Sequence, residues 1–221
     1  MHRQQFNRYF FYAVGVVLLS AGITLNTKTD LGVSPLISLP YSVAQIWDLS
    51  FPLMTFILYA FFIALQFIIK GRNRQMKDLL QLPLSVVFSL LLEVFSTGYE
   101  SIMAMLGLQL ELFAARILVL IVAVAMTGVG AAIMIAMDLI PNPADGLAHA
   151  VGEAFRKNLG FGKNFIDFSS VATTCLIGII STGHLVGVGI GTVVAMIGVG
   201  RCIAAFNLLC GSMMMLAVEN H

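Results

Sequence analysis

Long runs of apolar residues, separated by short polar breaks, make up most of this chain. They cover residues at about 9 to 26, 51 to 70, 79 to 106, 112 to 137, 164 to 182 and 185 to 217. Each is close to or above the roughly 20 residues that a helix needs to cross about 30 Å of hydrocarbon. The runs lack the alternation of an outer-membrane barrel, and a spanning helix satisfies its own backbone groups. We therefore expect an all-α membrane protein with six transmembrane helices.

Two shorter segments, at about 35 to 47 and 143 to 156, lie between these runs. Helices of this length cover only roughly 20 Å, so they are too short to span comfortably. If both cross the membrane, Lys and Arg divide almost evenly between its two sides. If both are re-entrant half-helices, nine lie on the cytoplasmic side and only Lys28 and Arg116 lie outside. The positive-inside rule favours this second topology, with both termini cytoplasmic. The nine are Arg3, Arg8, Lys70, Arg72, Arg74, Lys77, Arg156, Lys157 and Lys163.

The composition narrows the class of protein further. Of the 221 residues, 59% are hydrophobic and 10% are charged, whereas a soluble domain has roughly 25% charged residues. A net charge of +1 gives no reason to expect a nucleic-acid partner. The first apolar run has no small-residue cleavage site, so we interpret it as a retained helix. Cys175, Cys202 and Cys210 lack metal-ligand spacing, and the sequence predicts no metal or other cofactor.

The two short segments share a sequence pattern. "TDLGVSPLISLPYSVAQIW" at 29 to 47 and "MDLIPNPADGLAHAVGEAF" at 137 to 155 align with a constant offset of 108. The single membrane domain, residues 1–221, then divides into repeat 1 (about 9–106) and repeat 2 (about 112–217). Each repeat crosses three times, so the second copy is inverted relative to the first. Inverted repeats with broken helices are the architecture of many secondary transporters.

The order of elements and the paired breaks "DLGVSP" and "DLIPNPADG" resemble the YitT/YczE/YyaS family of bacterial integral membrane proteins. The resemblance covers nearly the whole chain. It implies a bacterial inner-membrane protein, and it supplies no catalytic or substrate residues. Long YitT members also carry a soluble C-terminal domain, which this sequence lacks.

The breaks carry the signals that start a helix. Ser34-Pro35 and Asn142-Pro143 each place a strong N-cap residue before a proline at the first helical position. In the re-entrant topology these helix N-termini point into the membrane and could bind an anion between them. Asp145, at the third helical position, would oppose an anion or cap its own helix. The alternative is a kinked helix at each break.

Other polar residues in the apolar runs are candidates for the same site. Glu93 and Arg201 lie near the middle of the last helix of each repeat, 108 residues apart, so we expect them to meet, either as a structural salt bridge or with Arg201 on the solute and Glu93 taking a proton. Asn207 could add a polar contact. Asp30 and Asp138 are candidates for coupling a cation or proton, or are loop residues. His149 could titrate or form a hydrogen bond to a neighbouring helix.

These features favour a secondary transporter of a small polar solute, with an anion as one candidate. The alternatives are a non-transporting scaffold or regulatory partner, and a passive channel. No nucleophile and base stand together, so we expect no enzyme. The expected partners are the solute and membrane lipid, and a homodimer is one open arrangement.

Overall fold

The computed structural model describes residues 2–73, 75–106 and 112–218. Arg74 lies outside this part, as do the side chains of Arg3 and Lys77. The described residues form eight α-helices and two short 3-10 turns (Gly71–Asn73 and Met76–Leu80), with no strand among them. The helices are α1 (His2–Thr27), α2 (Pro35–Trp47), α3 (Phe51–Lys70), α4 (Gln81–Leu106), α5 (Phe113–Met137), α6 (Pro143–Ala154), α7 (Leu159–Thr182) and α8 (Ile190–Val218).

Six of these helices are long and apolar enough to cross a membrane, which confirms the predicted class and the number of spans. They are α1, α3, α4, α5, α7 and α8. Many large apolar side chains on them are exposed, among them Ile68, Phe168 and Leu208. Such a surface is stable in hydrocarbon and not in water. The chain is a multi-pass membrane protein.

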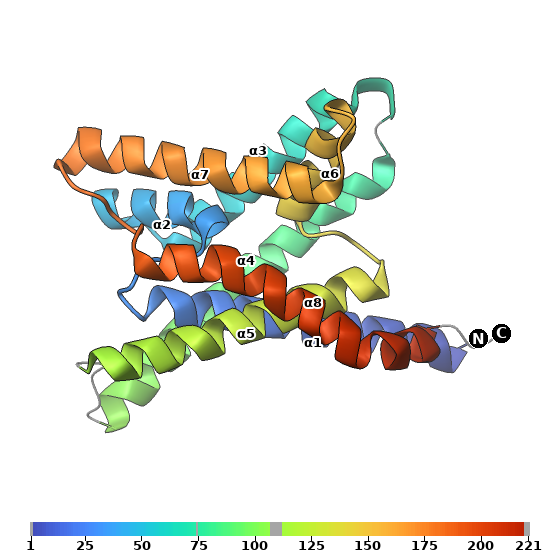
Figure 1. The fold of residues 1–221 in the computed structure, drawn as a ribbon, viewed down its shortest axis with the longest axis horizontal. Coiled ribbons are helices and arrows are strands. Elements are labelled where there is room, and N and C mark those ends of the chain that lie inside the picture. The colour runs from blue at the N-terminus through green and yellow to red at the C-terminus, as the bar shows by residue number, and fades with distance from the viewer. Residues whose placement is uncertain (1, 74, 107–111, 219–221) are drawn as a thin grey trace.

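The helices form two groups that are stacked in Figure 1. In the upper group, α7 packs on α2 and α6, and α3 packs on the same two short helices. In the lower group, α1 packs on α5, and α8 packs on both. Helix α4 contacts α1 and α3 and so joins the groups. The two groups are the walls of the cavity described below.

The two short helices lie in the upper group and run toward opposite ends of the molecule. Helix α2 has 13 residues and α6 has 12. In Figure 1, α2 begins in the middle of the molecule and runs to the left, whereas α6 begins in the middle and runs to the right. Each ends where the next long helix, α3 or α7, begins. Their N-termini therefore lie in the interior and their C-termini at the two ends.

Helices α1 and α5 cross closely because each contributes a glycine to the contact. A Cβ added to Gly22 would lie 2.6 Å from the backbone nitrogen of Thr127, and one added to Gly130 would lie 2.5 Å from that of Leu19. Gly22 and Gly130 are 108 residues apart, as are Leu19 and Thr127. The contact is therefore reciprocal. Small residues are typical of such close helix crossings in membranes.

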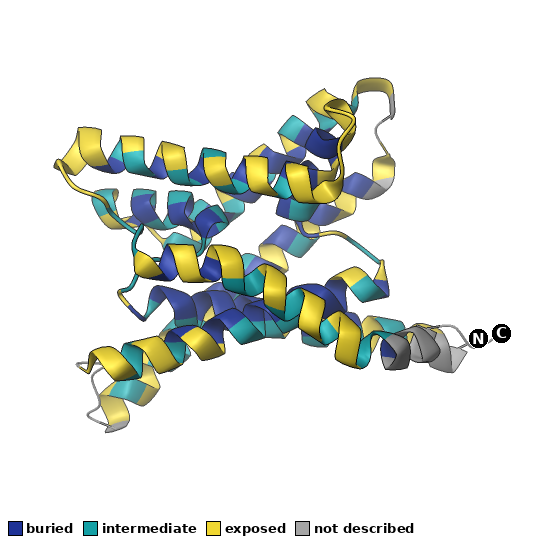
Figure 2. Ribbon diagram, viewed as in Figure 1, coloured by how far each residue is buried: buried dark blue, intermediate teal, exposed yellow. Residues whose placement is uncertain are grey.

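Burial is concentrated on these central helices. Figure 2 shows many buried positions on α1, exposed positions at the left end of α5, and mostly exposed positions on α8. Of the most apolar window of α1 and of α5, 56% is buried inside the protein, compared with 6% for α8. Helices α1 and α5 are thus the core of the lower group. Helix α8 contacts that core along one narrow face only.

Helix α7 begins earlier, and helix α8 begins later, than the apolar runs predict. Helix α7 begins at Leu159 and not near residue 164, because the Asn158 side chain accepts a hydrogen bond from the Phe161 nitrogen at 3.0 Å and caps the helix. Helix α8 begins at Ile190 and not near residue 185. Gly187 has a φ of 77°, a conformation outside a right-handed helix.

Candidate functional site: a central cavity between the two helix groups

A cavity of about 170 Å³ lies between the two groups of helices. Every helix except α4 contributes to its lining. The lining is polar near the start of α6 and the first turns of α7, and mainly apolar elsewhere. A concave, mostly apolar pocket with a few converging polar groups is the usual form of a small-molecule site.

Both predicted helix starts line this cavity. Ser34 and Pro35 contribute from the start of α2, and Asn142 and Asp145 from the start of α6. Helix α2 begins at Pro35 and α6 at Pro143, as the sequence predicts. The breaks therefore meet at one site, although residues 34 and 142 are far apart along the chain.

The two helix starts differ in whether the side chain of the N-cap residue accepts a hydrogen bond from the helix backbone. The Asn142 oxygen accepts a hydrogen bond from the Ala144 nitrogen at 3.0 Å, and its amide donates to the Tyr59 hydroxyl at 3.4 Å. The Ser34 side chain makes no capping hydrogen bond. Its hydroxyl is therefore available to a ligand, whereas the Asn142 side chain already holds α6 in place.

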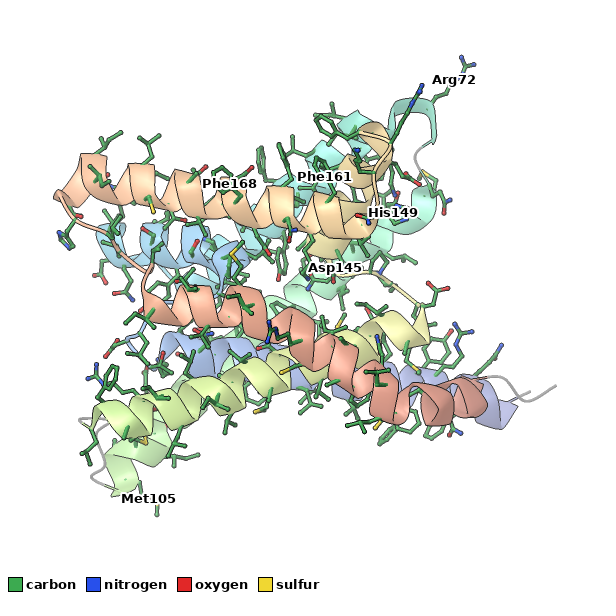
Figure 3. All side chains as sticks on the ribbon, viewed as in Figure 1. Arg72, Met105, Asp145, His149, Phe161 and Phe168 are labelled. Carbon is green, nitrogen blue, oxygen red and sulfur yellow. The ribbon has the colours of Figure 1, made fainter. Side chains whose placement is uncertain are left out.

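Charged side chains gather at the α6 end of the cavity. The Lys163 Nζ lies 3.3 Å from the Asp145 Oδ1. Asp167 lines the same cavity and stands four residues after Lys163, on the same face of α7. Figure 3 shows Asp145 where α6 faces the lower group of helices. Two carboxylates and one ammonium group give this end a formal charge of −1.

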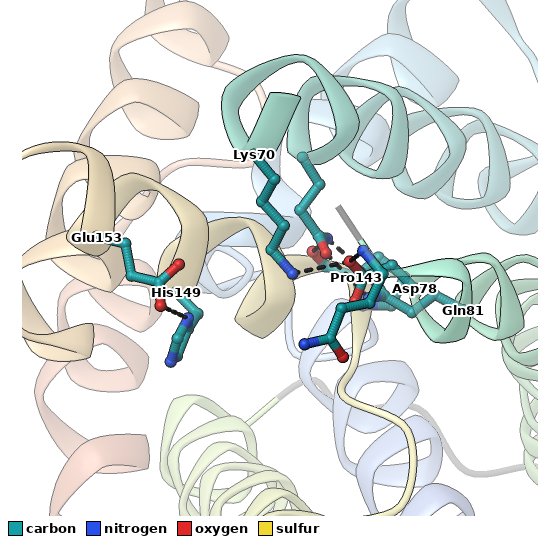
Figure 4. A network of polar contacts seen from close by, with 8 residues as sticks. Lys70, Asp78, Gln81, Pro143, His149 and Glu153 are labelled. Carbon is teal, nitrogen blue, oxygen red and sulfur yellow. Dashed lines mark hydrogen bonds and ion pairs between the residues drawn. The ribbon is translucent and has the colours of Figure 1, made fainter. Parts of the chain in front are cut away.

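Pro143 begins α6 but is fully buried beside the cavity, and it is not part of its lining. Its carbonyl oxygen accepts a hydrogen bond from the Gln66 amide at 3.4 Å. Gln66 and Gln81 exchange two amide hydrogen bonds, at 3.1 and 3.0 Å. Figure 4 shows this network, together with the ion pair of Lys70 and Asp78. It ties the start of α6 to α3 and α4.

Arg201 and Asn207 do not lie at the cavity, which corrects their predicted place at the site. Both are exposed on α8, while Val199 and Gly200 line the cavity beside them. The reason is the rotation of α8 about its axis. A Cβ on Gly128 of α5 would lie 2.4 Å from the Cβ of Cys202, so Cys202 faces α5. Arg201 then points about 100° away.

Glu93 and Arg201 do not meet either, so the predicted pair is wrong. Within the described residues, neither forms an ion pair. Glu93 is exposed on α4 and lines an open hollow at the far end of α1, together with Lys28, Asp30 and Tyr41. Helices α4 and α8 lie on different flanks of the α1–α5 pair. Two residues at equivalent positions of two repeats therefore need not contact each other.

The remaining predicted residues lie at the ends of the molecule. Asp30 and Asp138 follow α1 and α5 with φ angles of 55° and 46°, so they end these helices in the left-handed conformation that Asp tolerates. The Asp30 carboxylate lies 3.7 Å from the Arg116 guanidinium. His149 is exposed on α6, with its Nδ1 3.5 Å from the Glu153 carboxylate. None of the three lines the central cavity.

Lys163 and Asp167 are the site residues that the sequence reasoning missed. Lys163 is not a loop residue, as the topology count assumed, but lies in the second turn of α7. The sequence contains a signal for both residues. Two opposite charges one helical turn apart near the start of a membrane span are costly unless they are paired or hydrated, so they indicate function. Among the described residues, no group of three His, Cys, Asp or Glu side chains could hold a metal ion.

A family model matches residues 6–208, which contain both groups of helices. The chain belongs to the family of unknown function DUF6198. This membership assigns no activity, and the resemblance to the YitT/YczE/YyaS family stays a prediction. Comparison with curated proteins and with solved structures gave no match.

Proposed function

We propose that this protein is a secondary transporter, and not an enzyme, that carries a small polar solute through the central cavity. The observation that carries the proposal is that two helix starts of matching sequence meet at one cavity within a bundle of membrane helices. The first contributes Ser34 and Pro35 to its lining, and the second contributes Asn142 and Asp145. Interrupted helices that end at a shared interior site are typical of transporters, because their free backbone groups can bind a polar solute away from water.

We further propose that the two halves form an inverted repeat. The reciprocal contact of Gly22 and Gly130 supports this. So do the ends of α1 and α5: Arg8 donates to the carbonyl oxygen of Met137 at 2.8 Å, and Arg116, 108 residues later, pairs with Asp30. Ser50 and Asn158, also 108 apart, both cap the following helix with their side chains. A repeated unit explains all three coincidences.

In the proposed topology α2 and α6 are re-entrant, and both chain termini face the cytoplasm. The start of α1, the end of α8, and the loops after α3 and α6 lie at one end of the molecule in Figure 1. Of the nine Lys and Arg residues assigned to the cytoplasm, Arg8, Lys70, Arg72, Arg156 and Lys157 lie on these elements, whereas Lys163 lies inside α7 and Arg74 lies outside the described residues. The bacterial inner membrane is the location that this charge distribution and the YitT/YczE/YyaS resemblance favour.

Uptake into proteoliposomes tests the transport proposal. Purified protein would be reconstituted and offered a panel of small amines, amino acids, sugars and carboxylates under an imposed pH or sodium gradient. We expect one class to accumulate faster than in protein-free vesicles, and the variant Ala131→Trp, which places a bulky side chain on the lining of the cavity, to abolish the difference. Equal uptake by protein-containing and protein-free vesicles across the panel would contradict the proposal.

One observation favours the scaffold alternative. Helix α8 contacts the rest of the protein along a narrow face only, and Arg201 is exposed in the middle of its span. An arginine facing hydrocarbon costs several kcal/mol unless a partner or water meets it. A second protein, or a second copy of this one, bound along α8 would lower that cost. Co-purification of a stoichiometric partner from the native membrane, lost in Arg201→Leu, would support this function.

A further inference from the structure

We propose that the central cavity binds a small organic cation with an apolar body, held by the carboxylates of Asp145 and Asp167, and that the Lys163 ammonium group competes with this ligand for Asp145. This inference names the ligand class of the proposed transport site and so rests on that function for its physiological meaning. Binding itself can be measured without transport.

The charges at the α6 end of the cavity favour a cation. Asp145 and Asp167 outnumber Lys163, and Arg201, the cation expected to hold an anion, lies outside the lining. The Asp167 carboxylate forms no hydrogen bond or ion pair within the described part of the chain. Asp167 is half-buried, and a carboxylate that is partly removed from water is stabilised when a cation neutralises it. A ligand ammonium group would satisfy Asp167 without displacing any protein contact of that residue.

The rest of the lining favours an apolar body on the same ligand. The helices of the lower group contribute mainly apolar side chains to the lining: Leu19 and Ile23 of α1, Ala131 of α5, and Ala195 and Met196 of α8. The cavity volume of about 170 Å³ is close to the roughly 150 Å³ that holds one benzene molecule. The site therefore suits a ligand of about one ring or a short branched chain that carries a single ammonium group.

Lys163 has the position expected of an internal competitor. Its ammonium group lies 3.3 Å from Asp145, and its side chain is 41% exposed, so it is not locked in a packed core. A ligand cation that approaches the two carboxylates meets the same oxygen that Lys163 binds. Removal of the Lys163 charge should therefore strengthen the binding of cations and leave that of neutral molecules unchanged.

Binding of three probes of nearly equal size to the purified full-length protein tests the proposal. They are benzylammonium, neutral benzyl alcohol and benzoate. Calorimetry in detergent should give the tightest binding for benzylammonium and the weakest for benzoate. Asp167→Asn should weaken benzylammonium binding about tenfold or more and leave benzyl alcohol unchanged, because only the charged contact is lost. Lys163→Gln should strengthen benzylammonium binding about tenfold.

Glu153→Gln is the matched control, since Glu153 is an exposed carboxylate on α6 outside the cavity. It should change none of the three affinities. Benzoate binding tighter than benzylammonium would overturn the proposal, as would equal effects of Asp167→Asn and Glu153→Gln. A folded Lys163→Gln protein with unchanged cation affinity would overturn the role of Lys163. Should Lys163→Gln not fold, Asp167→Asn still decides, since it keeps the pair of Lys163 and Asp145.

The proteoliposome assay separates this inference from the proposed function. Benzylammonium binding that depends on Asp167, without accumulation of any amine, would leave the cation site in place and contradict transport. Accumulation of a carboxylate at a rate that Asp167→Asn does not change would support transport and overturn the cation site.

Discussion

At the scale of single residues, two glycines decide how closely α1 and α5 approach each other. Neither Gly22 nor Gly130 has room for a Cβ against the opposite backbone. Backbone atoms cannot move aside as the end of a flexible side chain can. A methyl group at either position must therefore separate the two helices at the centre of the protein.

We expect Gly22→Ala to destabilise the protein by about 1–3 kcal/mol, as overpacking of a core does. Gly98→Ala in α4 is the matched control, because a Cβ there meets nothing within 4 Å. It should not lower stability, since Ala is the better helix former. The midpoint of thermal unfolding in detergent measures both. A Gly22→Ala midpoint no lower than that of Gly98→Ala would contradict the close crossing.

The two N-cap residues give a second residue-scale prediction. Asn142→Ala should cost about 1 kcal/mol, because it removes the bond to the Ala144 nitrogen. Ser34→Ala should leave stability nearly unchanged, because Ser34 makes no capping hydrogen bond. The same unfolding measurement compares them. The sequence alone predicts equal effects, so a clear loss in Ser34→Ala would show that its hydroxyl stabilises the fold after all.

At the scale of elements, a buried amide pair joins α3 to the start of α4. Gln66 and Gln81 are both fully buried, and each donates to the other. A buried amide that loses its partner costs more than the hydrogen bond contributes, because it has no water to replace that partner. The pair therefore fixes the register of the two helices.

We expect Gln66→Leu alone to destabilise the protein by about 1–3 kcal/mol, since it leaves the Gln81 amide unpaired. The double variant Gln66→Leu/Gln81→Leu should recover part of that loss, because no unpaired amide remains. Coupling energies of such bonds in membranes average about 0.6 kcal/mol, so the recovery is small but measurable by a double-mutant cycle. Additive losses in the cycle would mean that the two amides do not depend on each other.

The starts of the two short helices could be predicted from the sequence. Which side of each long helix faces the cavity could not. Ser34-Pro35 and Asn142-Pro143 are local signals, so α2 and α6 begin at the predicted residues. The place of Arg201 depends on the rotation of α8, which the contact of Gly128 with Cys202 sets. An apolar helix carries no pattern that reveals this rotation. The apolar run starts after Lys163 and beyond the Asn158 cap, so the pattern puts Lys163 in a loop and leaves Asp167, inside the run, without a partner one turn before it.

At the scale of the whole molecule, the positive charges predict how the protein lies in the membrane. Single cysteines at Arg72 and Lys157, placed in a protein without Cys175, Cys202 and Cys210, should react with a membrane-impermeant reagent from the cytoplasmic side only. A cysteine at Lys28 should react from the outside only. Each of these positions lies in a loop between helices. Labelling of positions 28 and 72 from the same side would contradict the re-entrant topology.

The two halves are not packed alike, and this difference makes a second conformation predictable. Helix α3 packs on α4, but within the described residues the corresponding helices α7 and α8 do not pack along their lengths, although both line the cavity. If each half can adopt the arrangement of the other, a second state exists, related to this one by a pseudo-two-fold axis, in which α7 meets α8 and α3 leaves α4. A bifunctional thiol cross-linker between cysteines at 52 and 89, where the Ser89 hydroxyl donates to the Pro52 carbonyl oxygen at 2.6 Å, would forbid that exchange. If the protein transports as proposed, we expect the cross-link to stop uptake into proteoliposomes while ligand binding stays intact, so that the protein holds its ligand on one side of the membrane.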